Sequence, residues 1–232
     1  MTISERYAQV RKRVDDAALR SGRDPSEVTL LAVTKTHGVT EINEAVDAGA
    51  TDIGENRVQE LLEKYDGVKP VRWHLIGHLQ TNKVRQVIDK VVMIHSVDSL
   101  KLAKEIDKRA SARGIVMDVL IEINSAMEET KSGIAAGDLR KLAEDITAEC
   151  ASVRICGIMC IPPIAEDPED SRPYFREAAA LFEEMKTWDL PDDRFCPGVL
   201  SMGMSGDFET AVEEGATIVR VGSSIFGPRN YK

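Results

Sequence analysis

The sequence predicts an α/β protein, a (β/α)8 barrel of the TIM type that forms a single domain with an extra N-terminal helix. Eight short apolar runs recur along the 232 residues, and each is followed by a stretch with helical spacing, a pattern typical of parallel βαβ units. The alternative is an open doubly wound sheet, but no Gly-x-Gly-x-x-Gly fingerprint is present. No Gly/Ser-rich linker divides residues 1–232, so we expect one domain.

The expected strands are apolar and short. The first, residues 30–33, has no polar alternation, as expected for a strand that is buried on both faces. The others follow at residues 51–54, 71–77, 91–95, 116–124, 153–160, 199–202 and 218–221.

The expected helices follow from apolar spacing and from glycine stops. Residues 3–22 place Ile3, Tyr7, Val10 and Val14 on one face and end at Gly22. Only residues 222–232 follow the last strand, which leaves room for about one helical turn. We therefore expect the N-terminal helix to cover barrel surface that a full eighth helix would cover. Further helices are expected near residues 40–49, 57–65, 84–88, 98–113, before 150, at 171–188 and at 207–214.

Composition limits the function classes. A hydrophobic content of 43% and a charged content of 30% are typical of a globular protein with a full core. The net charge of -9 gives no basic field for nucleic acid, so a bound phosphate would need local donors. No apolar run can span a bilayer, no signal-peptide core is present, and the four cysteines form no C-x-x-C pair. We predict a cytoplasmic protein with reduced thiols and no metal site.

Lys35 stands at the carboxyl end of the first expected strand, where α/β barrels bind their ligands. By position alone, a solvated strand terminus is the simpler interpretation. The alternative is a nucleophile, since a lysine amine attacks a carbonyl group when it is unprotonated. Burial beside an apolar strand and a nearby cation both favour the neutral amine.

Two segments rich in glycine and serine follow the seventh and eighth expected strands, at residues 201–207 and 222–224. Barrels often hold phosphate at these two positions, with backbone amides and hydroxyl groups as donors. Ordinary turns, with Ser205 capping a helix, are the alternative. Together with Lys35, the segments fit a phosphorylated aldehyde, either pyridoxal 5'-phosphate (PLP) or a sugar phosphate.

Arg220 lies within the eighth expected strand. Such an arginine usually pairs with a carboxylate or points outward. If it faces a pyridine nitrogen instead, it can only donate a hydrogen bond, because arginine keeps its proton. The pyridine nitrogen would then stay unprotonated and the ring would be a weaker electron sink.

Several motifs together resemble the pyridoxal phosphate homeostasis protein family, whose members are single-domain relatives of the N-terminal barrel of alanine racemase. The resemblance covers nearly the whole chain. The motifs are residues 31–36 (LAVTKT), 54–60 (GENRVQE), 73–83 (WHLIGHLQTNK), 131–133 (KSG), 200–207 (LSMGMSGD), 219–223 (VRVGS) and 226–227 (FG).

The resemblance implies a role for each matching residue. Lys35 would form a Schiff base with PLP, Asn56 would approach the ring hydroxyl, and Arg220 would meet the pyridine nitrogen. Asn56 as a helix cap and Met202 as plain core are the simpler alternatives. The remaining implied contacts are Ser201, Gly222 and Ser223 to the phosphate, Met202 in the pocket lining, and Ile76 and His78 near the mouth.

The resemblance also implies a function in intracellular PLP (vitamin B6) homeostasis, without robust catalytic turnover. A racemase needs a base on each face of the α-carbon, and alanine racemase takes its second base from a tyrosine of an additional domain. The tyrosines of this chain lie in expected helices or at the tail. We therefore expect a protein that holds PLP and passes it to PLP-dependent apoenzymes or protects amino-acid pools. Since no exposed apolar helix face stands out, we expect a monomer.

Two enzymes stay open as alternatives. One is a PLP-dependent racemase or lyase of narrow scope, with His78 or a residue of a dimer partner as second base. The other is a cofactor-free aldolase that uses Lys35 on a sugar phosphate.

Overall fold

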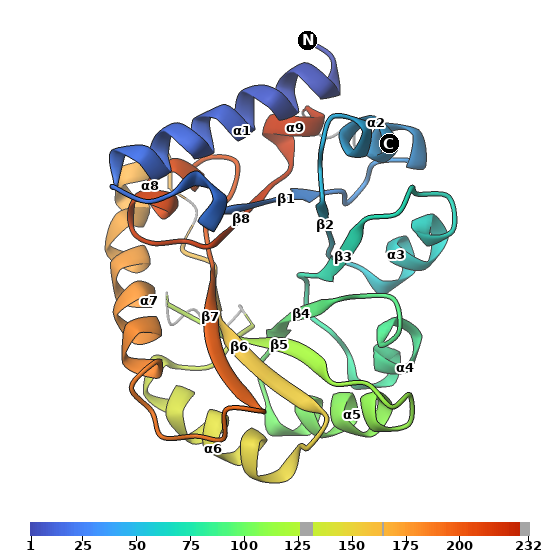
Figure 1. The fold of residues 1–232 in the computed structure, drawn as a ribbon, viewed down its shortest axis with the longest axis vertical. Coiled ribbons are helices and arrows are strands. Elements are labelled where there is room, and N and C mark those ends of the chain that lie inside the picture. The colour runs from blue at the N-terminus through green and yellow to red at the C-terminus, as the bar shows by residue number, and fades with distance from the viewer. Residues whose placement is uncertain (126–131, 164, 228–232) are drawn as a thin grey trace.

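In the computed structural model, which describes residues 1–125, 132–163 and 165–227, eight parallel strands close into a barrel in chain order (Figure 1). β1 pairs with both β2 and β8, which closes the ring. This confirms the predicted fold class. The strands are β1 (Thr29–Val33), β2 (Asp52–Glu55), β3 (Arg72–Leu75), β4 (Met93–Val97), β5 (Met117–Ile123), β6 (Val153–Cys160), β7 (Phe195–Ser201) and β8 (Ile218–Val221).

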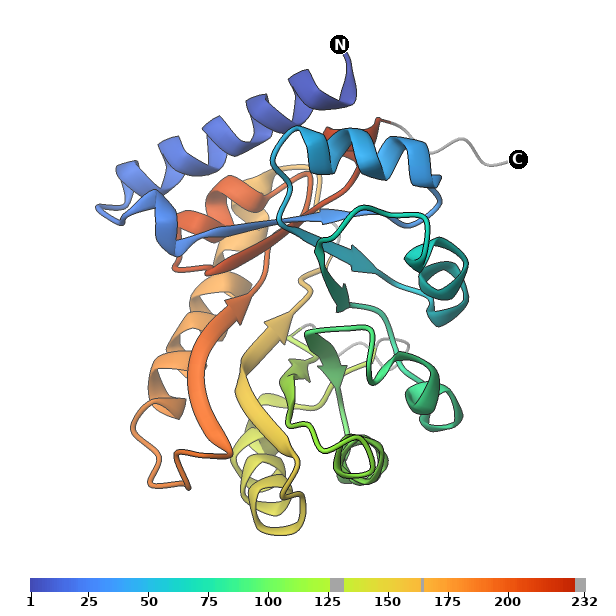
Figure 2. The same cartoon turned by 45° about the vertical axis from the view of Figure 1, so that its right-hand side comes forward.

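Helices surround the barrel, and Figure 2 shows them outside the strands on its sides. The α-helices are α1 (Ile3–Arg20), α2 (Val39–Asp47), α3 (Val58–Tyr65), α4 (Val84–Val87), α5 (Leu100–Ser111), α6 (Leu139–Glu149), α7 (Arg172–Met185), α8 (Phe208–Glu213) and α9 (Ser223–Phe226). Four 3-10 segments precede β1, α4, α6 and α7: η1 (Pro25–Glu27), η2 (Thr81–Lys83), η3 (Ala136–Asp138) and η4 (Pro168–Ser171).

Alternation along each strand divides the side chains between two layers. Leu30 and Ala32 of β1 join the main core between strands and helices, while Leu31 and Val33 cluster with Ile76 and other residues inside the barrel. The same alternation places Lys35 on the inner side, at the carboxyl end of the barrel. The strand pattern thus aims this lysine at the region where barrels bind ligands.

Strand β7 differs from the prediction, since it begins at Phe195 rather than at residue 199. Pro197 and Gly198 are typical of a turn, which hid the first half of the strand. In the fold they lie beside a register shift between Ile155 and Gly157 of β6, and a bulge of this kind tolerates a proline. Gly157 has φ +143°, and a Cβ there would lie 1.9 Å from the carbonyl oxygen of Val199, so the bulge requires glycine.

Helix α1 packs across α2, α8 and α9 (Figures 1 and 2). A capping box between Thr2 and Glu5 starts the helix, and its buried face carries Tyr7, Val10 and Val14. Helix α9 is a single turn. The N-terminal helix therefore covers surface that a longer eighth helix would have covered, as the sequence predicted.

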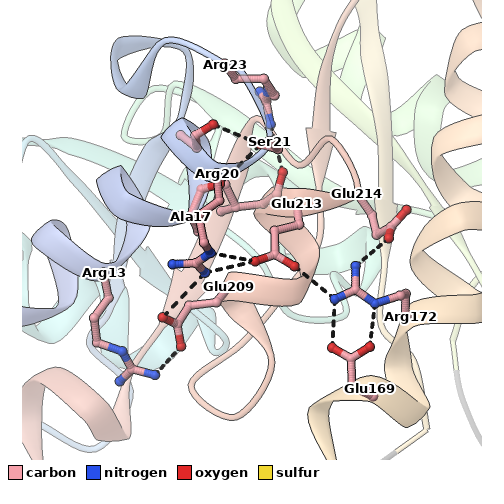
Figure 3. A network of polar contacts seen from close by, with 12 residues as sticks. Arg13, Ala17, Arg20, Ser21, Arg23, Glu169, Arg172, Glu209, Glu213 and Glu214 are labelled. Carbon is pink, nitrogen blue, oxygen red and sulfur yellow. Dashed lines mark hydrogen bonds and ion pairs between the residues drawn. The ribbon is translucent and has the colours of Figure 1, made fainter.

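A network of arginine and glutamate side chains joins α1, α7 and α8 (Figure 3). Glu213 of α8 accepts hydrogen bonds from Arg20 at 2.8 Å and from Arg172 at 2.9 Å. Glu209 of α8 pairs with Arg13 at 2.5 Å. Single exposed pairs contribute little, but here one short helix is held from two sides. The loop before α8 belongs to the site described below.

Two further features concern the apolarity of the helices and the state of the cysteines. None of the helices in residues 1–125, 132–163 and 165–227 is long and apolar enough to cross a bilayer. Cys150, Cys156 and Cys160 are buried free thiols, and Cys196 is an exposed one.

Candidate functional site

A pocket of about 440 Å³ opens at the carboxyl ends of the strands. Its wall combines a lysine, Lys35, from the N-terminal part of the sequence with a buried arginine, Arg220, and two glycine-containing loops from the C-terminal part. β1 and β8 are neighbours in the closed barrel, so closure brings them together. The lining residues are Val33, Lys35, His37, Asn56, Ile76, Ile161, Pro162, Met204, Ser205, Gly206, Arg220, Gly222, Ser223 and Gly227.

The backbone beside Lys35 is strained. Thr36 has φ 68°, a left-handed conformation that is rare for a β-branched residue and costs about 1–3 kcal/mol. The N–H of Thr36 donates to Oε2 of Glu60 at 2.7 Å, and this bond holds the strained turn. Lys35 is therefore set at a bend that local sequence preference alone would not form.

A buried ion pair holds the other side of Lys35. Nζ of Lys64 donates to the carbonyl oxygen of Thr34 at 3.0 Å and to Glu55 Oε1 at 2.7 Å. It also donates to Glu60 at 3.0 Å. The Glu55 side chain is completely buried, and this burial raises its pKa while Lys64 opposes the shift. Lys64 thus ties together the segments that flank Lys35.

Asn56 faces the pocket from the end of β2. Its Oδ1 atom is buried and has no hydrogen-bond partner within the part of the chain that the structure describes. A Cβ on Gly77 would lie 2.3 Å from the carbonyl oxygen of Asn56, so glycine is needed for this close approach. The site therefore offers an unused polar group to a ligand.

Arg220 is 4% exposed and lines the pocket. One of its terminal nitrogens donates to Oγ of Ser201 at 2.7 Å and the other to the carbonyl oxygen of Cys160 at 3.0 Å. Burial lowers the pKa of Arg220 to about 10, so it stays charged at neutral pH. These bonds use two of the five N–H donors of a guanidinium group, which leaves donors for a molecule in the pocket.

The loop after β7 is anchored next to the start of α9. Ser205 Oγ accepts the N–H of Gly222 at 3.1 Å. Asp207 accepts the N–H of Met204 at 2.6 Å and the hydroxyl of Ser171 at 3.1 Å. Asp207 directly precedes α8, the helix held by the network of Figure 3. Amides and hydroxyl groups are thus held together at a place suited to an anion.

The structure brings six predicted site residues to the pocket wall: Lys35, Asn56, Ile76, Arg220, Gly222 and Ser223. Three others lie elsewhere. Ser201 is buried beneath Arg220, and Met202 points into the main core because neighbouring strand residues alternate. The His78 side chain is 55% exposed and lies 3.5 Å from Asp98. Lys131 of the KSG motif lies outside the described residues.

Two wall residues with polar side chains, His37 and Ser205, were not predicted as site residues. The ring of His37 stacks on Phe226 at 4.7 Å, and its Nδ1 lies 3.2 Å from Glu41. His37 stands two positions after Lys35, so strand alternation continued past β1 could have suggested it. Ser205 was considered only as a helix cap or a general donor.

Glu122 of β5 is a buried carboxyl group. Its Oε2 has no hydrogen-bond partner among the described residues. Burial and the nearby charge of Asp98 raise its pKa from 4.5 to about 7, against the opposing charge of Arg220. A raised pKa means that the folded state loses stability as the pH rises from the unfolded value through about 7.

We expect Glu122→Gln to remove this pH dependence. Between pH 5 and pH 8 the free energy of unfolding of the wild type should fall by up to about 3 kcal/mol more than that of Glu122→Gln. Urea unfolding at several pH values measures the difference. Glu63→Gln, at an exposed position of α3, is the control and should follow the wild type. Parallel curves for wild type and Glu122→Gln would refute the assignment.

Known proteins resemble this chain over nearly its whole length. Residues 7–230 match the model of the alanine racemase N-terminal domain. The pyridoxal phosphate homeostasis protein of Aquifex aeolicus is 47% identical over 100% of both chains. That of Escherichia coli K12 is 41% identical over 99% of this chain and 97% of the relative.

A solved structure extends the likeness to three dimensions. PipY of Synechococcus elongatus PCC7942 with PLP bound matches with a TM-score of 0.81 and 35% identity, over 97% of this chain and 100% of that one. Full-length identity, the family model and the shared barrel lead to one assignment. The chain belongs to the pyridoxal phosphate homeostasis protein family, within the proteins that share the alanine racemase N-terminal domain.

Proposed function

We propose that this chain binds PLP in the barrel pocket, as a Schiff base on Lys35, and serves intracellular PLP homeostasis. The observation that carries the proposal is the convergence of Lys35, Arg220 and the loops at 204–206 and 222–223 on one wall. The pocket volume of about 440 Å³ lies in the range of sites for small cofactors. The PLP-bound PipY structure, similar over nearly the full chain, supports the proposal.

The donor set fits each part of the cofactor. The charged guanidinium of Arg220 would donate to the pyridine nitrogen. Asn56 would meet the ring hydroxyl, since an amide offers either an acceptor or a donor and its buried oxygen is unused by the described residues. Bound PLP supplies an aldehyde that condenses with amines and a ring that can accept electrons.

The phosphate would lie between the loop after β7 and the start of α9. Gly222 would lie beside the phosphate with its N–H bonded to Ser205 Oγ, and Ser223 would contribute donors. Ser205 fits this place better than Ser201, because Ser205 lines the pocket while Ser201 is bonded to Arg220. Gly222 also lets the backbone pass β1, since a Cβ there would lie 3.3 Å from the carbonyl oxygen of Val33.

The site favours storage over turnover. Arg220 would hold the ring nitrogen without protonating it, which weakens the ring as an electron sink. His78, the predicted candidate for a second base, is not on the pocket wall. We therefore propose a cytoplasmic, monomeric carrier that keeps the free aldehyde low and passes PLP to apoenzymes.

An absorption spectrum of the purified chain with added PLP tests the proposal, before and after borohydride reduction and followed by peptide mass mapping. We expect a Schiff-base band that collapses on reduction, with the adduct on Lys35. No band, or adducts spread over surface lysines, would refute the binding site. Rapid exchange of an amino acid's α-hydrogen with deuterated solvent would instead favour the racemase or lyase alternative.

A further inference from the structure

A continuous row of hydrogen bonds crosses the inside of the barrel below Arg220. Its five members are Arg220, Ser201, His95, His74 and Asp52, which we call the barrel relay. Arg220 donates to Ser201 at 2.7 Å, and Ser201 Oγ lies 3.1 Å from His95 Nδ1. His95 Nε2 lies 2.9 Å from His74 Nδ1, and His74 Nε2 lies 2.9 Å from Asp52 Oδ1. All five residues are buried.

The far end of the barrel relay reaches a second pocket at the amino ends of the strands. This pocket has a volume of about 340 Å³, and Asp52, His74 and Asp118 line it. Arg72, whose side chain is 60% exposed, also lines it and pairs with Asp52 at 2.7 Å. The barrel relay thus connects two opposite mouths of the barrel through a core position that is usually apolar in this fold.

The chemistry of the two ends is satisfied by one row of donors and acceptors in which both histidines are neutral. Arg220 can only donate, so Ser201 accepts from it and is free to donate its own hydroxyl proton to His95 Nδ1. Nδ1 of His95 is then an acceptor, and its Nε2–H donates to His74 Nδ1. Nε2–H of His74 donates to Asp52, which as a carboxylate only accepts. In this row both imidazoles are neutral and carry their proton on Nε2.

Charges around the barrel relay favour this arrangement. Burial is the main cause that lowers the pKa of His95 well below its usual value, and the charge of Arg220 acts in the same direction. Burial acts against the ionised form of Asp52, but hydrogen bonds from His74, Arg72 and Thr51 outweigh it and lower the Asp52 pKa to about 2. At the other end, Glu122, Cys160 and Asp207 are the charged or titratable groups that act on Arg220. Reversing the row of protons would require Asp52 to be protonated so that it could donate to His74, and its lowered pKa disfavours this at neutral pH.

We propose that the barrel relay orients Arg220 for the cofactor ring and couples the opposite mouth of the barrel to the PLP site. Ser201, His95, His74 and Asp52 are then positioning residues. This inference rests on the proposed function, since Arg220 matters in this way only if it meets the ring. It gives the buried Ser201 a role different from phosphate binding.

The first test needs no cofactor. Nitrogen NMR of the histidine side chains in the full chain reports which ring nitrogen carries the proton. The chain has four histidines, and His74→Gln and His95→Gln assign two of them. We expect His74 and His95 to be neutral and protonated on Nε2 at neutral pH. A proton on Nδ1 of either ring, or a doubly protonated ring, would overturn the proposal.

The second test reads the bound cofactor. Ser201→Ala cuts the barrel relay next to Arg220, and Asp52→Asn keeps an acceptor oxygen at the far end but removes its charge. Both should shift the absorption maximum of bound PLP and the midpoint of its pH titration, Ser201→Ala by more. Asp118→Asn removes a carboxylate that also lines the pocket at the amino ends of the strands but lies outside the barrel relay. This variant should leave the absorption maximum and the titration midpoint unchanged.

The outcomes separate the two proposals. If the wild type forms no Schiff base on Lys35, the proposed function fails, and the NMR result still decides the order of protons. If the wild type binds PLP but Asp52→Asn and Asp118→Asn give the same spectra as the wild type, the coupling is wrong. If a variant does not fold, as circular dichroism would show, the NMR measurement on the wild type decides.

Discussion

Lys35→Ala should abolish covalent retention of PLP and lower the affinity for PLP by on the order of 100-fold, about 2.7 kcal/mol. The proposed remaining contacts, from Arg220 and from the loops at 204–206 and 222–223, would still hold the ring and the phosphate in this variant. The loss therefore measures what the Schiff base adds to them. Absorption titration with PLP gives the affinity, and borohydride reduction followed by mass spectrometry gives the covalent fraction.

The control for this prediction is Lys12→Ala. Lys12 is an exposed lysine of α1 that pairs with Asp16, far in sequence from the pocket loops. Its removal should change neither the affinity nor the adduct. A Lys35→Ala protein that keeps a reducible adduct and the wild-type affinity would show that another lysine carries the cofactor.

Lys64→Met should destabilise the fold by about 3–5 kcal/mol, because it leaves the buried Glu55 carboxylate without its partner. Methionine preserves most of the side-chain length, so the effect reports mainly the lost charge and its three hydrogen bonds. Urea unfolding measures the loss. Affinity for PLP should fall as well, because Lys64 holds the segments on either side of Lys35.

Two further variants complete this test. Lys69→Met breaks an exposed ion pair with Asp47, and should cost no more than about 1 kcal/mol. The double variant Lys64→Met with Glu55→Gln should recover part of the lost stability, since the buried charge is removed with its partner. Equal losses for Lys64→Met and Lys69→Met would contradict the role of the buried pair.

The sequence predicts the barrel well where apolar runs are uninterrupted. The last strand, residues 218–221, matches β8 at both ends. The prediction fails where a local signal opposes the fold: Pro197 and Gly198 resemble a turn but lie within β7 beside a bulge. β4 lies two residues later than expected, at Met93–Val97. An apolar run does not indicate at which residue its pairing with the neighbouring strands begins.

Some residues of the site could be predicted from the sequence and others could not. Lys35 and Arg220 could be predicted because each stands at a strand end of a recognisable barrel. Ser201 and Met202 were assigned to the pocket from their motif, but strand alternation turns Ser201 beneath Arg220 and Met202 into the core. The barrel relay could not be predicted, because only closure of the barrel brings His74, His95 and Ser201 from three different strands into one row.

The packing of α1 against α9 has a consequence for how the protein is made. Nε of Arg6 donates to the carbonyl oxygen of Ile225 at 2.5 Å, across 219 positions of sequence, and β1 cannot complete its pairing until β8 has been synthesised. Contacts so distant in sequence form slowly and late. A ribosome-bound chain therefore exposes an unfinished sheet edge until its final strand emerges, and the pocket can capture PLP only after that.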